Sequence, residues 1–172
     1  MAKVLNGLEE LDHTLRTSPS HPLLKSGSVH ASLIEGGQEL STYPDHCSLR
    51  IERRTIPGET QERVEAEIQR IFDRIAASDP AFKATLHTIL VRDPFEVHED
   101  EYIVQLVRNQ AGRVLGSEPA MTSGTGWMDA ALLATAGIPT VVFGPGGAGA
   151  HAVVEWADLE QVEQCAEILL KV

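Results

Sequence analysis

The sequence predicts an α/β protein built from two parts. In residues 1–91 the hydrophobic periodicity changes in the order helix, strand, strand, helix, strand. This order favours a two-layer sandwich in which helices cover an antiparallel sheet. After Asp93-Pro94 the pattern changes, and helices alternate with short apolar runs, which is typical of a parallel or mixed α/β sheet. We therefore expect two domains, residues 1–92 and residues 93–172.

The composition excludes several function classes. The chain has 172 residues, of which 42% are hydrophobic, and a formal net charge of −11, so the basic face of a nucleic-acid-binding protein is not expected. No apolar run approaches the roughly 20 residues of a membrane span, and no signal-peptide pattern opens the chain. We expect a cytoplasmic protein with no membrane partner. Cys47 and Cys165 are expected to be buried free thiols, because their spacing fits neither a disulfide framework nor a CxxC site.

The first half begins with a predicted helix at residues 2–15, where leucine and valine recur at helical spacing. Alternating apolar residues then predict a strand at 29–34, and a second strand is expected from about residue 46 to 54. A connection of this length most simply joins the two strands as an antiparallel hairpin.

Residues 59–77 give the clearest helical pattern, because an apolar stripe follows acidic first turns. The stripe consists of Val64, Ile68, Ile71, Phe72 and Ile75. Asp79-Pro80 ends this helix, and residues 82–91 alternate again as a predicted third strand. The resulting α-β-β-α-β order is one strand short of the ferredoxin-like β-α-β-β-α-β unit.

The second half contains a predicted buried strand at Ile138–Phe143 followed by a glycine-rich loop. In open α/β sheets the carboxyl ends of the strands are where ligands bind, so this loop is expected at a binding edge. The other predicted elements are a helix at 100–115 ended by Gly116, a short strand at 119–123, a helix at 128–136 and a last helix capped by Asp158.

The glycine-rich loop runs from Phe143 to His151 and holds four glycines and a proline. His151 could be a metal ligand, a general base or an ordinary loop residue. Asp129 and Glu155 are candidate carboxylates near it. One histidine and two carboxylates do not fill a zinc site, which needs three or four close ligands. The loop lacks the P-loop and GxGxxG spacings, which argues against a nucleotide phosphate.

Two adjacent arginines, Arg53 and Arg54, end the second predicted strand. One interpretation is a solvated strand end. The other is a guanidinium fork directed at a carboxylate group, because the planar guanidinium matches a carboxylate with two parallel hydrogen bonds. The residues alone leave both interpretations open.

Taken together, these motifs and their order resemble the C-terminal half of a metallopeptidase family. The family includes acetylornithine deacetylase, succinyl-diaminopimelate desuccinylase and the aminoacylases. The motifs that carry the resemblance are Ile34-Glu35-Gly36-Gly37, Tyr43-Pro44-Asp45, Arg53-Arg54-Thr55-Ile56-Pro57-Gly58-Glu59, Trp127-Met128-Asp129-Ala130, Gly137-Ile138-Pro139, and Gly144-Pro145-Gly146 followed by His151 and Glu155-Trp156.

The resemblance implies a fold and a chemistry. Residues 1–92 would be a truncated lid or dimerisation domain, a ferredoxin-like sandwich lacking its first strand. Residues 93–172 would be the C-terminal part of an α/β zinc-hydrolase catalytic domain. Family members hydrolyse the amide bonds of N-acyl amino acids or small peptides with two zinc or cobalt ions, and they form homodimers through the lid.

The resemblance also implies roles for single residues. His151 would be one metal ligand, Arg54 would bind the substrate carboxylate, Gly146 would line the substrate cleft, and Asp129 would lie at the edge of the active site. The family's HxD motif, bridging aspartate and paired glutamates have no counterpart here. We therefore expect a fragment without a complete catalytic set, inactive alone, with zinc or cobalt absent or weakly bound.

Three functional hypotheses follow. The first is a fragment of a metal-dependent hydrolase that cleaves N-acyl amino acids or small peptides. The alternative is a self-association module without catalytic activity, because an unpaired strand edge invites pairing with another copy. The third is a complete small enzyme that uses His151, Asp129 and Glu155 without the missing ligands.

Overall fold

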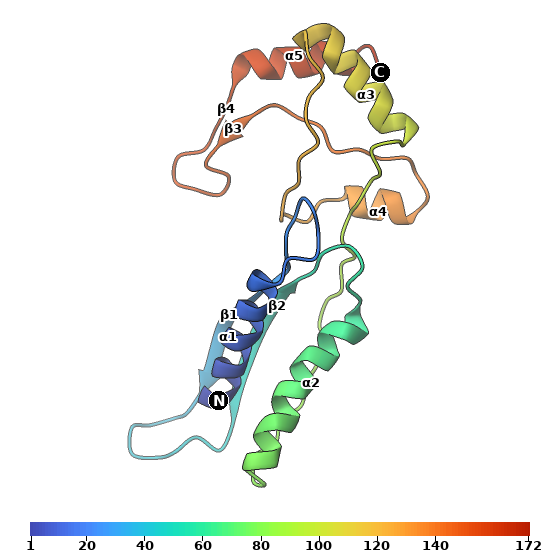
Figure 1. Cartoon of the computed structure of the whole chain (residues 1–172). Coiled ribbons are helices and arrows are strands. Elements are labelled where there is room, and N and C mark those ends of the chain that lie inside the picture. The colour runs from blue at the N-terminus through green and yellow to red at the C-terminus, as the bar shows by residue number, and fades with distance from the viewer. The chain divides into compact units, whose positions relative to one another are not determined.

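The computed structural model describes all 172 residues, which form two compact units (Figure 1). Unit 1 consists of Met1–Pro94 and Ser123–Thr125. Unit 2 consists of Phe95–Thr122 and Gly126–Val172. Each unit has its own buried residues and is described separately. Both contain helices and strands, so the predicted α/β class is confirmed.

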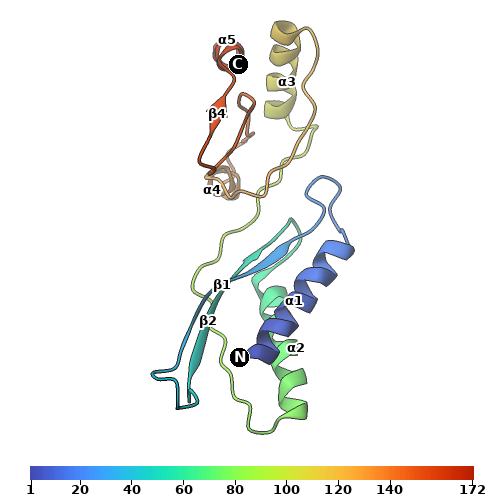
Figure 2. The same ribbon diagram turned by 90° about the vertical axis from the view of Figure 1, so that its left-hand side faces the viewer.

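Unit 1 contains two helices and a β-hairpin, as the hydrophobic periodicity predicts. The helices are α1 (Ala2–Thr17) and α2 (Gln61–Ser78), and the antiparallel strands are β1 (Ser28–Gly36) and β2 (Cys47–Arg54). Both helices lie on the same side of the hairpin (Figure 2). The Thr60 hydroxyl caps α2 by accepting a hydrogen bond from the Arg63 amide at 3.3 Å.

The core of unit 1 lies between the two helices and the hairpin. Each helix contributes residues three or four positions apart, which places them on one face. The buried members are Val4 and Leu8 of α1, Val29 of β1, and Ile68, Ile71 and Ile75 of α2. This apolar layer fixes which face of the hairpin is covered.

A β-bulge changes the hairpin at Ser32. The register pairs Ala31 with Ile51 but Leu33 with Arg50, so Ser32 has no partner of its own. A bulge bends a strand and increases its twist. Beyond it, Leu33 and Ile34 are 53% and 55% exposed, whereas Val29 before it is buried.

The predicted third strand at residues 82–91 is wrong. The segment places Phe82 and Leu86 against the core, and the Thr88 hydroxyl donates to Glu65 at 2.5 Å. No backbone hydrogen bonds join it to the hairpin, so the sheet has two strands. Alternation in the sequence marks which side chains face a core, but a strand also needs a hydrogen-bonded neighbour. The ferredoxin-like arrangement stays a prediction.

Unit 2 contains three helices and one very short hairpin. The helices are α3 (Tyr102–Leu115), α4 (Ala130–Thr135) and α5 (Leu159–Leu169). The hairpin pairs β3 (Gly147–Ala148) with β4 (Trp156–Ala157). All three helices are predicted by the sequence, whereas this hairpin is not.

The α3 and α5 helices pack on each other through small and branched side chains. Val104, Ala111 and Ile168 are almost completely buried between them. Gly116 ends α3 at φ 77°, a conformation that glycine adopts without strain. The Asp158 carboxylate caps α5 by accepting from the amides of the second and third following residues, as predicted.

The predicted strands at 119–123 and 138–143 are wrong, and no parallel sheet forms in unit 2. Ile138 and Val142 are 49% and 46% exposed, so the second segment is not buried either. An apolar run becomes a buried strand only beside a strand with which its backbone can pair. The glycine-rich loop therefore does not follow the end of a sheet strand.

Two simpler expectations concern the cysteines and the membrane. Both cysteines are free, as predicted, but Cys47 and Cys165 are only half-buried. Desolvation raises the pKa of the Cys165 thiol. None of the helices is long and apolar enough to span a bilayer.

Candidate functional site

The two adjacent arginines at the end of β2 lie in different environments. Successive side chains of a strand point to opposite faces, so Arg53 and Arg54 separate. The Arg53 side chain is 4% exposed and the Arg54 side chain 42%. The two interpretations of this pair therefore apply to different residues, and only Arg54 is open to a ligand.

Arg53 is the centre of a buried charged group that we call the Arg53 cluster, consisting of Gly27, Arg53, Glu59 and Glu67. Its Nη2 and Nη1 atoms donate to the two Glu59 carboxylate oxygens at 2.6 and 3.1 Å. Its Nε atom donates to Glu67 at 3.1 Å. Desolvation by itself would lower the pKa of Arg53, but the hydrogen bonds and charges of the two glutamates raise it above its ordinary value.

The Arg53 cluster also holds the backbone of the turn that follows β2. The Nη1 atom of Arg53 donates to the Arg54 carbonyl oxygen at 2.6 Å. The Glu59 carboxylate accepts from the Ile56 amide at 3.0 Å. Gly27 leaves room for this arrangement, because a Cβ atom there would come within 2.5 Å of the Arg54 carbonyl oxygen. The turn is thus tied at both ends to one buried guanidinium–carboxylate pair.

On the exposed side of the hairpin, the Arg54 side chain is oriented by Glu52. The Arg54 Nε atom lies 3.3 Å from a Glu52 carboxylate oxygen, which also lies 3.2 Å from the His30 ring. His30 and Glu52 are directly opposite in the β1–β2 register. Because Glu52 takes only the Nε side, both terminal nitrogens of Arg54 remain available for an anionic group.

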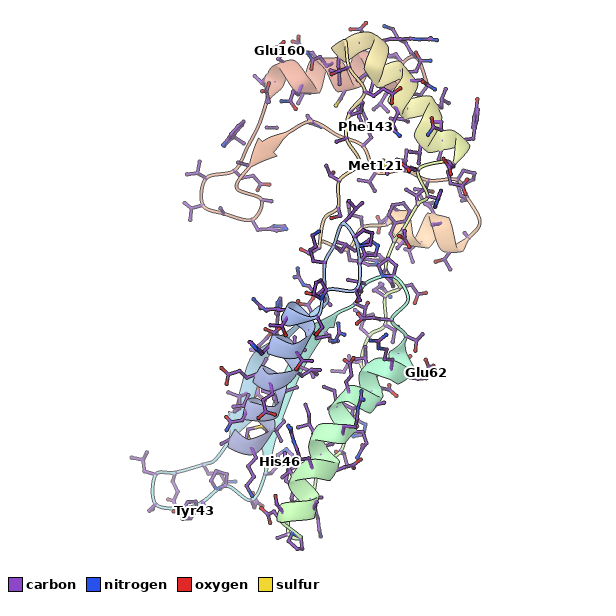
Figure 3. The ribbon with its side chains drawn as sticks, viewed as in Figure 1. Tyr43, His46, Glu62, Met121, Phe143 and Glu160 are labelled. Carbon is purple, nitrogen blue, oxygen red and sulfur yellow. The ribbon has the colours of Figure 1, made fainter.

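Unit 2 contains an open depression of about 580 Å³ beside α4. It is bounded by the turn that begins α4 and by the extended segment that ends at Phe143. Figure 3 labels Phe143. The lining residues are mostly apolar: Trp127, Met128, Asp129, Ala130, Leu133, Thr140, Val141, Val142 and Phe143. A depression of this composition suits an apolar ligand group.

Asp129 is the one charged residue of the depression. It occupies the N-cap position of α4, but its side chain makes no capping hydrogen bond. Its backbone carbonyl accepts from the Leu132 and Leu133 amides at 2.9 and 3.2 Å. The exposed carboxylate makes no hydrogen bond to the helix and can therefore bind a polar or cationic group of a ligand.

Gly146 lies within the glycine-rich loop and is hydrogen-bonded to residues at the beginning of α5. Its amide donates to the Gln161 side chain at 2.8 Å, and its carbonyl accepts from the Asp158 amide at 3.0 Å. A Cβ atom at Gly146 would come within 2.7 Å of the Gln161 side-chain oxygen. Both backbone polar groups of Gly146 are thus already used within the chain.

His151 lies in the turn between β3 and β4 and is exposed. Its φ of 63° is unusual for a residue with a side chain. The turn is closed by a hydrogen bond of 2.8 Å from the Ala152 amide to the Gly149 carbonyl. Gly149 also has a positive φ, and a Cβ atom there would clash with the Val154 carbonyl oxygen. The loop presents the imidazole without a hydrogen-bonding partner.

The residues present do not fit a zinc or cobalt site. No group of three or more histidine, cysteine, aspartate or glutamate side chains in the chain is close enough to hold a metal ion. In particular, His151, Asp129 and Glu155 do not form such a group. A zinc site needs three or four close ligands, so this chain offers single ligands only. The three side chains of the third hypothesis, a complete small enzyme, are therefore not gathered into a metal site.

The sequence reading missed the glutamates of the Arg53 cluster. Glu67 is 7% exposed although it lies within the apolar stripe of α2, between Val64 and Ile71. A charged residue in such a stripe is rarely buried unless it is paired. A glutamate at an apolar position of the helical stripe therefore indicates a buried cationic partner, and that partner is Arg53.

Comparison with known proteins places these features in a family. Residues 7–172 match the sequence profile of Peptidase family M20/M25/M40. The chain belongs to this family. The match covers both units, including the Arg53 cluster, the α4 depression and the glycine-rich loop.

Curated relatives include both deformylases and deacetylases. The chain is 30% identical over 185 residues to the N-formyl-4-amino-5-aminomethyl-2-methylpyrimidine deformylase of Bacillus subtilis (strain 168), covering 99% of the chain and 43% of the relative. It is 26% identical over 145 residues to the acetylornithine deacetylase of Myxococcus xanthus, covering 84% and 37% respectively.

Among solved structures, a tripeptidase from Staphylococcus aureus subsp. aureus Mu50 matches with a TM-score of 0.70 at 20% identity. The match covers 97% of this chain and 43% of that structure, and it shows the shared fold. The chain thus spans 37–43% of the length of these relatives.

Proposed function

We propose that this chain forms part of a hydrolase that cleaves the amide bond of N-acyl amino acids or small peptides. The family match across residues 7–172 carries the proposal. In it, Arg54 binds the substrate carboxylate and His151 supplies one metal ligand. Because the other ligands are not gathered here, we derive no metal-dependent step, and we expect the chain alone to be inactive.

The geometry supports a recognition role for Arg54. Its exposed terminal nitrogens offer the planar fork that pairs with a carboxylate through two hydrogen bonds. In unit 2, the depression beside α4 suits an apolar acyl or side-chain group, and Asp129 suits a polar end. Gly146 is proposed to line the cleft through its Cα face, since its amide and carbonyl are already bonded.

A chimera tests the proposal. Residues 7–172 would replace the matching segment of the Myxococcus xanthus acetylornithine deacetylase, and hydrolysis of N-acetylornithine would be measured with zinc or cobalt. We expect metal-dependent turnover that falls roughly tenfold or more in the His151→Ala variant, because a lost ligand weakens metal binding at least as much as a lost outer-shell partner. We also expect Arg54→Ala to raise KM.

The matched control is His87→Ala, which removes an exposed histidine of unit 1. This variant is expected to keep full turnover. Circular dichroism and a cooperative thermal transition would establish that each chimera is folded. A folded chimera that is inactive, or one whose turnover survives His151→Ala, would contradict the proposal.

Self-association is a second candidate function, favoured by the hairpin. β1 pairs only with β2, so no strand pairs with its other edge, and the same strand carries the exposed apolar side chains of Leu33 and Ile34. A free edge can pair with the same edge of a second copy. We expect light scattering after size exclusion to give twice the mass of one chain.

The control for self-association compares two lysine substitutions. Ile34→Lys is expected to shift the equilibrium toward monomer, whereas Val153→Lys, at a fully exposed position in unit 2, is expected to leave it unchanged. A chain that stays monomeric at high concentration would rule out a homodimer through this edge.

A further inference from the structure

We infer that Arg53 is a positioning residue which, together with Glu59 and Glu67, fixes the direction in which Arg54 meets its carboxylate ligand. The inference rests on the proposed function, in which Arg54 binds that carboxylate. It assigns a role to a buried charged group that the recognition step does not itself use. Three features of the molecule support this role: the rigidity of Arg53, its hydrogen bond to the Arg54 backbone, and the orientation of the Arg54 side chain by Glu52.

The first feature is that Arg53 has essentially one orientation available. Its Nε, Nη1 and Nη2 atoms all donate to carboxylate oxygens of Glu59 or Glu67. The three side chains are only 4–6% exposed, so water cannot replace these partners. A planar guanidinium that is hydrogen-bonded at every nitrogen in a low-dielectric environment has little freedom to move.

The second feature is that Arg53 holds the peptide group on which Arg54 depends. Its Nη1 atom donates to Glu59 and also to the Arg54 carbonyl oxygen, the latter at 2.6 Å. Two residues on, the Ile56 amide donates to the same Glu59 carboxylate. The backbone from Arg54 to Ile56 is therefore fixed against one ion pair, which sets the direction of the Arg54 Cα–Cβ bond.

The third feature is that Glu52 orients the Arg54 side chain from the exposed face. The contact to Glu52 is made by Arg54 Nε at 3.3 Å, so neither terminal nitrogen is used in it. A half-exposed ion pair alone gives little rigidity, because solvent screens it and long side chains move. The buried Arg53 cluster supplies the rigidity that the Glu52 contact lacks.

The composition of the cluster also favours a positioning role over a purely stabilising one. Two carboxylates face one guanidinium, and Arg63 approaches Glu67 only to 3.8 Å from a 57% exposed position. Buried ion groups of this kind are often no more stabilising than well-packed apolar residues of similar volume. Their contribution is to hold the charged groups in fixed positions. In this protein the fixed Arg53 guanidinium is hydrogen-bonded to the backbone of Arg54.

The test measures the mobility of Arg54 by NMR relaxation of its Nε–Hε group and backbone amide. Arg53→Lys keeps the charge, but the three N–H donors of a single ammonium group cannot replace the four hydrogen bonds that Arg53 makes to Glu59, Glu67 and the Arg54 carbonyl. We expect the order parameter of the Arg54 backbone amide to fall from the range of rigid backbone, about 0.85, to below about 0.6, and the order parameter of the Nε–Hε group to fall with it. Ile75→Val, a core substitution in the same unit that leaves the Arg53 cluster intact, serves as the control and should leave them unchanged.

A second variant provides the same measurement if Arg53→Lys does not fold. Glu67→Gln keeps an acceptor for Arg53 Nε and is expected to give an intermediate loss of order at Arg54. If the Arg54 order parameters in both variants match those of Ile75→Val, Arg53 has only a structural role and the inference is overturned.

Titration with an N-acetyl amino acid and with its amide separates this inference from the proposed function. We expect the acid, and not the amide, to shift the Arg54 resonances of the wild-type chain, with at least threefold weaker binding in Arg53→Lys. Equal affinity in the two proteins would overturn the inference. If no ligand shifts Arg54 while Arg53→Lys still loosens it, the positioning stands and the proposed recognition by Arg54 fails.

Discussion

Replacing Arg53 with methionine is expected to lower the free energy of unfolding of unit 1 by about 3–5 kcal/mol. Methionine keeps an unbranched apolar stem like that of arginine, but it ends short of the guanidinium position and donates no hydrogen bonds. The variant would leave Glu59 without a cationic partner and Glu67 with only the 3.8 Å contact to Arg63, in a site where the two glutamate side chains are 4% and 6% exposed. It would also remove the donor to the Arg54 carbonyl. Removing one partner of a buried ion pair is costly because the remaining charge keeps its desolvation penalty.

The neighbouring residue provides the matched control. Arg54→Met makes the same chemical change one position along β2, at a side chain that is 42% exposed and contacts only Glu52. Its effect should stay within about 0.5 kcal/mol, as for most surface substitutions. Urea denaturation followed by circular dichroism measures both. Equal losses in the two variants would show that Arg53 is not a buried anchor.

A triple variant separates the charge penalty from lost packing. When Arg53→Met is combined with Glu59→Leu and Glu67→Met, no unpaired buried charge remains. We expect the triple variant to recover most of the stability, since apolar replacement of a whole buried ion group is often neutral or favourable. Recovery would also show that the charges are not needed for stability, which agrees with a role in holding the Arg54 backbone.

Patterns within a segment predicted the helices and the hairpin, because their determinants are local. The α2 stripe, the Asp158 cap and the Gly116 terminus each depend on residues within a few positions along the chain. Strand alternation also gives the opposite directions of Arg53 and Arg54 once β2 is located.

The failures concern pairings between segments distant in the sequence. Residues 82–91 alternate as a strand should, and residues 138–143 are apolar enough to be one, yet neither has a hydrogen-bonded neighbour. The Arg53–Glu67 pair spans 14 positions and two elements, so no local pattern showed that these two charges meet. The loop that carries His151 closes through β3 and β4, whose paired length of two residues is too short to leave a periodic signal.

Truncating Ile71, which contacts Gly7 where α1 and α2 pack together, is expected to cause a second large loss in the free energy of unfolding. Ile71 is 5% exposed, and its Cγ2 atom lies where a Cβ of Gly7 would come within 2.5 Å. Ile71→Ala should therefore lower the free energy of unfolding by about 2–5 kcal/mol, the range for truncating a buried aliphatic side chain. Denaturant unfolding measures the loss, and Ile71→Val, which removes one methyl group, should lose about 0.5–1.5 kcal/mol.

The same contact allows a double-mutant cycle that tests the packing itself. Gly7→Ala adds a methyl group where Ile71 already fills the space, so overpacking should cost about 1–3 kcal/mol despite the better helix propensity of alanine. In the Gly7→Ala/Ile71→Ala variant the new methyl group occupies part of the cavity left by isoleucine. The combined loss should then be smaller than the sum of the single losses, by at least about 0.5 kcal/mol. Strict additivity would mean that α1 and α2 do not cross at Gly7 and Ile71, because residues without a shared contact have no reason to compensate each other.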